Sequence, residues 1–221
     1  MIDTNSTVPN YAALLELHEM TDSEVPKWLK DELGRRDSII DADELRRLAL
    51  EAGVPKRYSW AVPDSSRNEL MAKGTGYYLH GVSGDGKSTL AAGMLKGWLA
   101  AGMGQALWVP AVQLMPEISD TYGGKGSETA VVGRYTHAAL LVIDDLGKEN
   151  VGRWSISKLF WLLDARYGAQ LPTVVTSQHS PEELGTIMAA QDAETAKAIV
   201  GRMRETYRQI RMGDVDHRLE G

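Results

Sequence analysis

A glycine-rich stretch at residues 81–88 constrains this chain more than any other part of its sequence. It has the sequence Gly-Val-Ser-Gly-Asp-Gly-Lys-Ser, the complete pattern of a phosphate-binding loop. The glycines let successive backbone N–H groups face one anion, Lys87 reaches the β and γ phosphates, and the Ser88 hydroxyl ligates Mg²⁺. The sequence therefore predicts a nucleoside triphosphate site with Mg²⁺, formed by Gly81, Val82, Ser83, Gly84, Asp85, Gly86, Lys87, Ser88 and Thr89.

The residues on either side of the loop support this prediction. Residues 77–80 form a short aromatic and aliphatic run that is typical of a strand. Residues 88–101 carry apolar side chains at helical spacing and stop at Gly102. Strand and helix patterns then alternate, with strands expected at 77–81, 105–110, 138–144 and 172–177 and helices at 87–101, 111–121 and 150–167. This alternation predicts an α/β fold in which a parallel sheet lies between helices.

Two carboxylates follow the most apolar of these strands. Residues 138–143 form an uninterrupted apolar run that ends in Asp144 and Asp145. Because sites of parallel sheets lie at the carboxyl edge, we expect Asp144 to hold Mg²⁺ through its water shell and Asp145 to orient or deprotonate the attacking water. The alternative is a strand-ending turn, where Asp is common. Gln178 ends the next strand, where its amide could reach the γ phosphate or the water, although such polar strand ends are also ordinary.

Composition indicates one substantial core in a cytoplasmic protein. The chain has 221 residues, of which 43% are hydrophobic, and contains no cysteine, so nothing suggests disulfides or a thiolate metal site. Its first residues lack the pattern of a signal peptide, and no run approaches the roughly 20 apolar residues of a membrane span. The net charge of −6 argues against indiscriminate adhesion to nucleic acid, although it leaves room for a local basic patch.

Residues 1–57 are expected to form a small helical region in front of a main domain at residues 58–221. The clearest of its helices begins with Asp41 and Glu44, in a pattern like a capping box, and ends before Gly53. Three short amphipathic helices need a partner surface, which is each other, the main domain or another protein. The following residues, 55–67, have the composition of a linker.

Two polar segments leave alternatives open. Residues 122–128 are glycine-rich and predict a mobile loop, flanked by Lys125 and Arg134, that is either simply mobile or a contact for a partner or a nucleic-acid strand. Residues 197–218 carry Arg202, Arg204, Arg208, Arg211 and Arg218 against few acids. They form either a solvated helix face or a group of arginines that reaches phosphates.

With these motifs in place, residues 54–218 resemble the helicase-loader branch of the bacterial AAA+ ATPases, the DnaC and DnaI type, and its relative IstB. The resemblance rests on the phosphate loop and on residues 53–58, 76–81, 141–147, 165–167, 172–177, 199–203 and 213–218. It implies a P-loop AAA+ domain that binds ATP and Mg²⁺. Too few residues follow Ser180 for the lid of typical AAA+ proteins, which agrees with the reduced C-terminal lid of the loader branch.

The resemblance also implies roles for individual residues. Arg202 aligns with the arginine finger, which completes the ATP site of a neighbouring subunit, and Arg218 aligns with the second sensor arginine, which contacts nucleotide in its own subunit. Both roles require self-association through the ATP site. Gln178 stands where the family usually has Asn, and Asp145 stands where many AAA+ proteins have Glu. These two departures suggest slow hydrolysis, typical of a switch more than of a motor.

The function that the resemblance implies is an ATP-dependent helicase loader. Residues 1–57 would hold a hexameric replicative DNA helicase, and ATP-bound domains would assemble near single-stranded DNA and release the helicase on hydrolysis. The main alternative is an IstB-type regulator of transposition, whose oligomer wraps duplex DNA; the mixed to acidic character of residues 1–57 mildly favours a protein partner. A P-loop kinase for a small molecule and a nucleotide-binding scaffold without catalysis are further alternatives.

Overall fold

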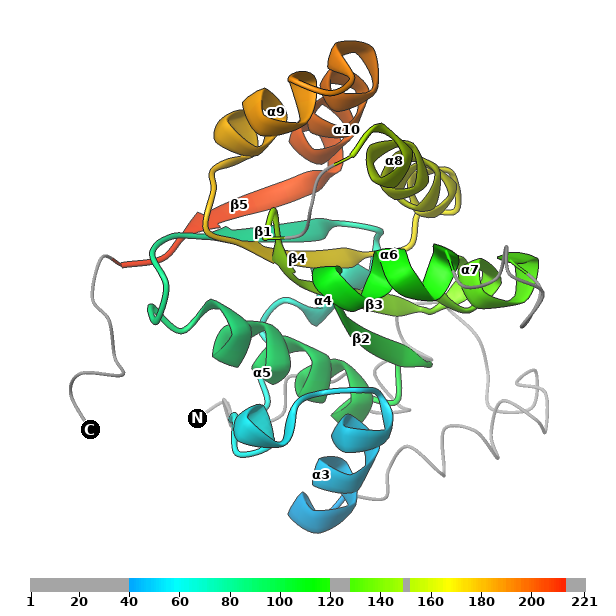
Figure 1. Ribbon diagram of the computed structural model, residues 1–221. Helices are drawn as coiled ribbons and strands as arrows, with labels where there is room; N and C mark the ends of the chain where they lie inside the picture. The colour runs from blue at the N-terminus through cyan, green and yellow to red at the C-terminus, as the bar shows by residue number, and fades with distance from the viewer. Residues whose placement is uncertain (1–39, 120–127, 149–151, 214–221) are drawn as a thin grey trace, which may run out of the picture.

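The computed structural model describes residues 40–119, 128–148 and 152–213 (Figure 1). In this part of the chain, parallel strands form one five-stranded sheet in the order β2-β3-β4-β1-β5. The strands are β1 (Gly76–His80), β2 (Ala106–Pro110), β3 (Leu140–Leu146), β4 (Thr173–Ser177) and β5 (Tyr207–Arg211). The predicted fold class, a P-loop domain whose parallel sheet lies between helices, is confirmed.

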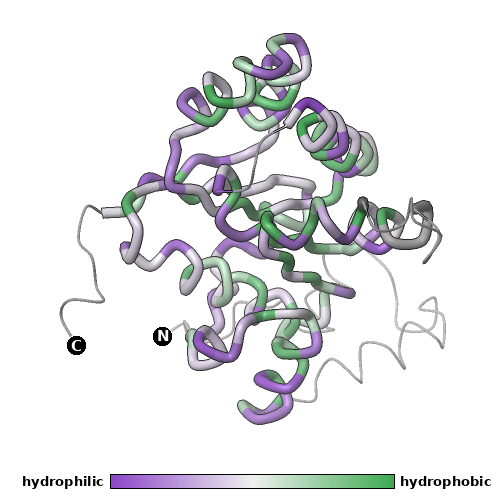
Figure 2. Tube along the Cα trace, viewed as in Figure 1, coloured by the Kyte–Doolittle hydropathy of each residue, from purple (hydrophilic) through white to green (hydrophobic). Residues whose placement is uncertain are grey.

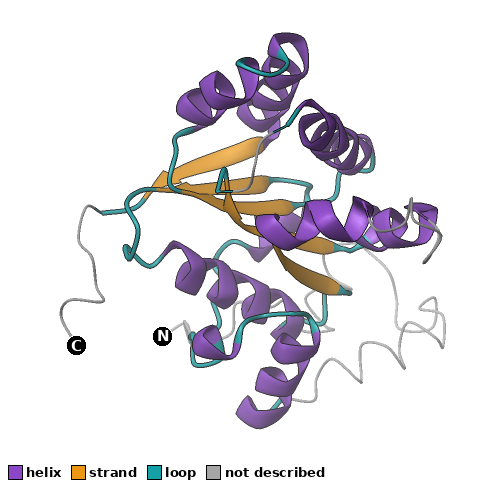
Figure 3. Ribbon diagram, in the orientation of Figure 1, coloured by secondary structure: helices purple, strands orange, loops and turns teal. Residues whose placement is uncertain are grey.

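Helices cover both faces of this sheet, and each sequence pattern expected to be a helix is one in the described residues. One layer contains α3 (Ala42–Glu51), α4 (Asn68–Ala72) and α5 (Lys87–Ala100). The other contains α6 (Ala111–Ser119), α7 (Glu128–His137), α8 (Arg153–Gly168), α9 (Pro181–Ala189) and α10 (Ala193–Thr206). Hydrophilic and hydrophobic residues alternate along these helices, as expected when one side lies on a sheet (Figure 2). The layers are visible in Figure 3.

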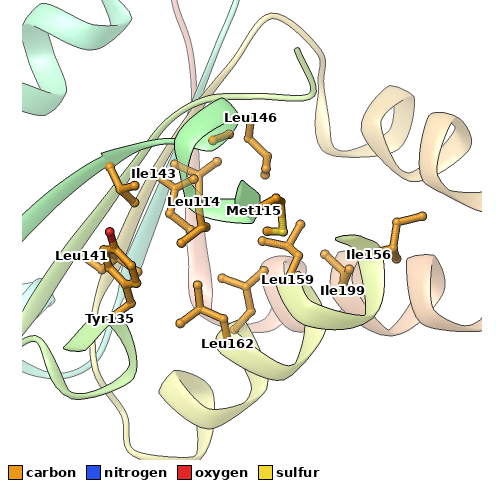
Figure 4. Packing of buried hydrophobic residues seen from close by; sticks show 14 of the residues in the cluster. Leu114, Met115, Tyr135, Leu141, Ile143, Leu146, Ile156, Leu159, Leu162 and Ile199 are labelled. Atoms are coloured by element: carbon orange, nitrogen blue, oxygen red, sulfur yellow. The ribbon is translucent and has the colours of Figure 1, made fainter. Parts of the chain in front are cut away.

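The two cores follow from the alternation of side chains along each strand. Tyr77 and Leu79 pack in the layer of α5, whereas Tyr78 between them packs in the opposite layer. In the same way Val142 and Ile143 point to opposite faces. Figure 4 shows the larger cluster, where side chains of α6 and α8 meet those of β3. Strands buried on both faces read as continuous apolar runs, which is why the sequence revealed them.

The helix predicted to begin at Asp41 is α3, and it lies against the main domain. The Asp41 side chain accepts a hydrogen bond from the Glu44 backbone N–H at 2.8 Å, which is half of the expected capping box. The backbone N–H of Trp108 in β2 donates to the carbonyl of Ala52 at 2.7 Å, and Ala49 belongs to the core beneath α5. Three partner surfaces were considered for such a helix, and α3 packs on one of them, the main domain.

The stretch expected to be a linker, residues 55–67, contacts α5 closely. It contains the short 3-10 helix η2 (Lys56–Tyr58). Lys96 of α5 is buried, and its Nζ donates to the carbonyls of Ser59 at 3.0 Å and Ala61 at 2.7 Å. Because these bonds satisfy a buried ammonium group, they hold the segment beside the helix whose first turn carries the phosphate loop. Nothing in the structure tests the predicted boundary between residues 57 and 58, which stays a prediction.

The arginine-rich C-terminal stretch is only partly the helix face considered for it, because Arg202 and Arg204 lie in α10 whereas Arg208 and Arg211 do not. Helix α10 ends at Thr206, and the next residues form the edge strand β5, which pairs in parallel with β1. Its pattern is weak because polar residues dominate and only Tyr207 and Ile210 are partly buried apolar positions. The predicted mobile loop at 122–128 falls almost wholly outside the described residues, and Glu128 begins α7. In the described part of the chain, no helix is long and apolar enough to span a membrane.

Candidate functional site

The phosphate loop joins the end of β1 to the start of α5, as its sequence predicts. Strand β1 ends at His80 and α5 begins at Lys87. Gly86 is the residue before the helix and has a φ of 90°, a left-handed conformation that glycine adopts without strain. The first N–H groups of a helix have no partner within it, and the helix dipole places positive charge there. The loop therefore presents the N-terminus of α5 to an anion, as in other phosphate sites.

Lys87 is held inside this loop. The residue is only 5% exposed, and its Nζ donates to the carbonyl oxygens of Gly81 at 2.9 Å and Val82 at 2.6 Å. A third bond goes to Oδ1 of Asp85 at 2.8 Å. These contacts fix the ammonium group where the loop curls around it. The ammonium group thus lies beside the cavity that the loop residues line, where a bound phosphate would meet it.

Ser88 and Asp144 form the predicted magnesium side of the site. The Ser88 hydroxyl donates to Oδ1 of Asp144 at 2.7 Å, and the Thr176 hydroxyl donates to the same oxygen at 2.7 Å. The Thr176 oxygen in turn accepts from the backbone N–H of Asp145 at 2.8 Å. Burial raises the pKa of Asp144, while the hydrogen bonds from Thr176 and Ser88 act in the opposite direction. The chain thus brings together a hydroxyl from α5 and a carboxylate from β3.

These two groups fit Mg²⁺ in a nucleotide complex. Within the described ranges, no group of three or more His, Cys, Asp or Glu side chains could hold a metal ion by itself. Mg²⁺ bound to nucleotides needs no such cage, because it keeps several waters and takes one or two protein oxygens together with phosphate oxygens. Ser88 would supply one such oxygen and Asp144 would hold the bound waters, while the phosphate loop beside them supplies the place for the phosphates.

Asp145 lies in an irregular part of β3, which runs on to Leu146 instead of ending at the predicted residue 144. The pairing of β3 with β4 shifts between Ile143 and Leu146, and Asp145 has a φ of 59°. Asp tolerates this left-handed conformation better than most residues. Asp145 lines the same cavity as the phosphate loop, and its Oδ2 accepts from Lys148 Nζ at 2.9 Å. The proposed base therefore lies at the cavity of the phosphate loop and is paired with a cation.

A cavity of about 450 Å³ brings these groups together. It is lined by residues 83–89 of the loop and α5, by Asp145 and by Lys148. Gln178 follows β4 and is not among the described residues that line it. The structure adds lining residues that the motifs did not predict: Arg57, Tyr58 and Trp60, from the segment docked on α5. Only the resemblance at residues 53–58 pointed to this segment.

Arg202 lies away from this cavity, near the edge where the strands begin. It is in α10, pairs with Asp164 of α8 and lies 5.0 Å from the ring centre of Phe160 and 5.2 Å from that of Tyr167. It lines a second cavity of about 620 Å³ with residues that precede β1, β4 and β5. The two cavities share no lining residue. Arg218 falls outside the described residues, so its predicted contact with nucleotide stays a prediction.

Comparisons with known proteins agree with this geometry. A family model described as "IstB-like ATP binding protein" matches residues 70–220, and no curated protein matches the chain. The crystal structure of the DnaC helicase loader is similar with a TM-score of 0.59 at 20% identity, covering 72% of this chain and 100% of that one. The crystal structure of DnaI is similar with a TM-score of 0.58 at 22% identity, covering 72% of this chain and 94% of that one. The structure of AMPPCP-bound DnaA from Aquifex aeolicus is similar with a TM-score of 0.54 at 16% identity, covering 72% of this chain and 51% of that one. At these identities the likeness establishes the fold.

Proposed function

The chain belongs to the family of IstB-like ATP binding proteins, and from that premise we propose that it is an ATP-dependent helicase loader. In this proposal residues 1–57 bind a hexameric replicative DNA helicase. ATP binding drives assembly of several copies at single-stranded DNA, and slow hydrolysis releases the helicase. The protein thereby acts as an ATPase whose turnover depends on self-association.

The observation that carries the nucleotide chemistry is the network at the end of β3. Ser88 and Thr176 both donate to Oδ1 of Asp144 beside the phosphate loop, which is the arrangement that a Mg²⁺ nucleotide requires. Asp145 lines the same cavity, where it would orient the attacking water. Its pairing with Lys148 and the position of Gln178 outside the cavity lining support slow turnover in an isolated copy.

The loader role itself rests on likeness to proteins of known type. The similarity covers 100% of the chain in the DnaC helicase loader structure and 94% of the chain in the DnaI structure. A DnaA structure that shares the fold, with a TM-score of 0.55, holds AMPPCP and single-stranded DNA. These similarities support a role in delivering a helicase to single-stranded DNA.

An IstB-type regulator of transposition is the second candidate. The family match over residues 70–220 favours it, because that family takes its name from IstB. The ATP site would be the same, and ATP-dependent oligomers would wrap duplex DNA and recruit a transposase. The two candidates differ in the partner and in the form of DNA that they bind.

One experiment separates them. The full chain, with an ATP analogue, is mixed with a hexameric replicative helicase and single-stranded DNA in one series and with duplex DNA in another, and assemblies are followed by analytical ultracentrifugation. A helicase complex that requires both the analogue and intact Lys87 supports the loader. Analogue-dependent oligomers on duplex DNA without helicase capture support the regulator. A monomer under all of these conditions contradicts both, and favours a P-loop kinase or a non-assembling scaffold.

A further inference from the structure

Every N–H bond of the Lys87 ammonium group is used within the phosphate loop. An ammonium group has three donors, and these go to the carbonyls of Gly81 and Val82 and to Oδ1 of Asp85. Carbonyls of the loop are neutral acceptors that position the lysine. The Asp85 carboxylate is an anion, as is the phosphate that Lys87 is expected to bind. Asp85 therefore takes the donor that a nucleotide would use.

The same carboxylate also approaches the backbone of the loop. Its Oδ1 accepts from the backbone N–H of Lys87 at 3.3 Å, which is one of the first N–H groups of α5. Asp85 thus receives a main-chain and a side-chain donor at the positive end of the helix, a combination that phosphate sites present to their ligand. The side chain acts here as an internal substitute for the anion.

Asp85 is held in this position without satisfying all of its own polar atoms. The residue is 3% exposed, and its Oδ2 is buried without a hydrogen-bond partner. A Cβ atom at Gly81 would collide with that oxygen, so the carboxylate fits only because position 81 is glycine. A buried carboxylate oxygen without a partner is costly. Because one carboxylate oxygen has no partner, the position of Asp85 depends on the bonds that its other oxygen accepts from Lys87.

We propose that Asp85 competes with the nucleotide for Lys87 and thereby lowers the affinity of the phosphate loop for ATP. This inference rests on the proposed function, because it assumes that ATP is the ligand of this loop. When the β and γ phosphates enter, they take over the Lys87 donor, and the Asp85 carboxylate loses its cation beside further negative charge. ATP binding must therefore replace one anion, the Asp85 carboxylate, by another, the phosphate. The loop therefore binds ATP more weakly than it would with a neutral residue at position 85.

The test measures ATP affinity of the full chain by isothermal titration calorimetry in the presence of Mg²⁺. Asp85→Asn keeps the shape and an acceptor oxygen but removes the charge, and Asp85→Ala removes the acceptor altogether. Because charge-assisted hydrogen bonds are roughly twice as strong as neutral ones, we expect Asp85→Asn to bind ATP about tenfold more tightly. AMP, which lacks the β and γ phosphates that Lys87 reaches, should bind with unchanged affinity. Asp43→Asn, an exposed change of the same charge on α3, should leave both affinities unaltered.

The outcomes separate this inference from the proposed function. Tighter ATP binding by either Asp85 variant, including binding gained where the natural protein shows none, supports the competition. If the natural protein binds ATP and both variants bind it equally or more weakly, Asp85 supports the loop instead of competing with the ligand, and only this inference fails. If neither the natural protein nor any variant binds ATP, the proposed function fails together with the inference.

Discussion

Replacing Arg166 by Met tests how the strands are held at the edge opposite the phosphate loop. Arg166 in α8 has no exposed surface. Its Nε donates to Thr173 Oγ1 at 2.8 Å, and its Nη atoms donate to the carbonyls of Tyr135 at 2.8 Å, Ala138 at 2.7 Å and Pro172 at 2.6 Å. Burial lowers the pKa of Arg166 to about 10, so the side chain remains a cation at neutral pH.

The expected loss of stability follows from these four bonds. Arg166→Met removes the donor from the buried carbonyls of Tyr135 and Ala138, at about 1–3 kcal/mol each, and leaves the Pro172 carbonyl with the more distant N–H of Leu141 at 3.4 Å. The substitution also removes the cost of burying a cation, which is several kcal/mol and acts in the opposite direction. We expect a net loss of about 3 kcal/mol in the free energy of unfolding, because the lost hydrogen bonds from a charged donor, at about 1.5–3 kcal/mol each, outweigh the relief of burying the cation.

Urea unfolding of the full chain, followed by circular dichroism, measures this loss. With a slope of about 1–3 kcal/mol per molar urea, the unfolding midpoint should fall by about 1–3 M. Arg153→Met is the matched control, because it makes the same change in the same helix at a side chain that is 79% exposed, and it should cost less than about 0.5 kcal/mol. The reasoning would be refuted if Arg166→Met shifted the unfolding midpoint no more than the control does.

Three predictions concern the nucleotide site. Lys87→Ala should weaken ATP binding by about a hundredfold in calorimetric titrations, because it removes a charged donor to the phosphates, whereas the exposed Lys197→Ala should not. Asp145→Asn should keep ATP binding, since Asn also accepts the left-handed conformation, and should stop phosphate release because the carboxylate is lost. Unchanged turnover would remove Asp145 from the mechanism. Arg202→Ala should spare nucleotide binding but reduce ATP-dependent assembly and hydrolysis, and normal hydrolysis at every protein concentration would exclude its role as a finger.

The sequence predicted the elements whose signals are local. Strands β1 to β4 are apolar runs buried on both faces, and their observed bounds lie within about two residues of the predicted ones. The start of α9 also has a local signal, because Ser180 and Glu183 form a capping box. Strand β5 was missed because it is an edge strand whose partner, β1, lies more than a hundred residues earlier. Its pairing is a tertiary effect that no local pattern contains.

The site shows the same division. The rule that parallel sheets gather their sites at the carboxyl edge predicted that Asp144 would lie near Ser88, and the two are hydrogen-bonded. Thr176 was missed, although a hydroxyl in an apolar strand beside the predicted aspartates was a usable signal. The contact of Asp85 with Lys87 could not be predicted, because it depends on how the loop curls around the ammonium group.

The position of Arg202 bears on whether one copy of the chain can form a complete ATP site. Strand β5 pairs Tyr207 with Gly76 and Arg211 with His80, so α10 joins the sheet at the end of β1 that is farther from the phosphate loop. A strand of this length spans roughly 16 Å at about 3.3 Å per residue. Under the proposed role, Arg202 would therefore act on the nucleotide of another copy, and it would first have to leave Asp164. Such a contact joins two different surfaces of the chain, and contacts of this kind build rings or open helical assemblies instead of closed dimers.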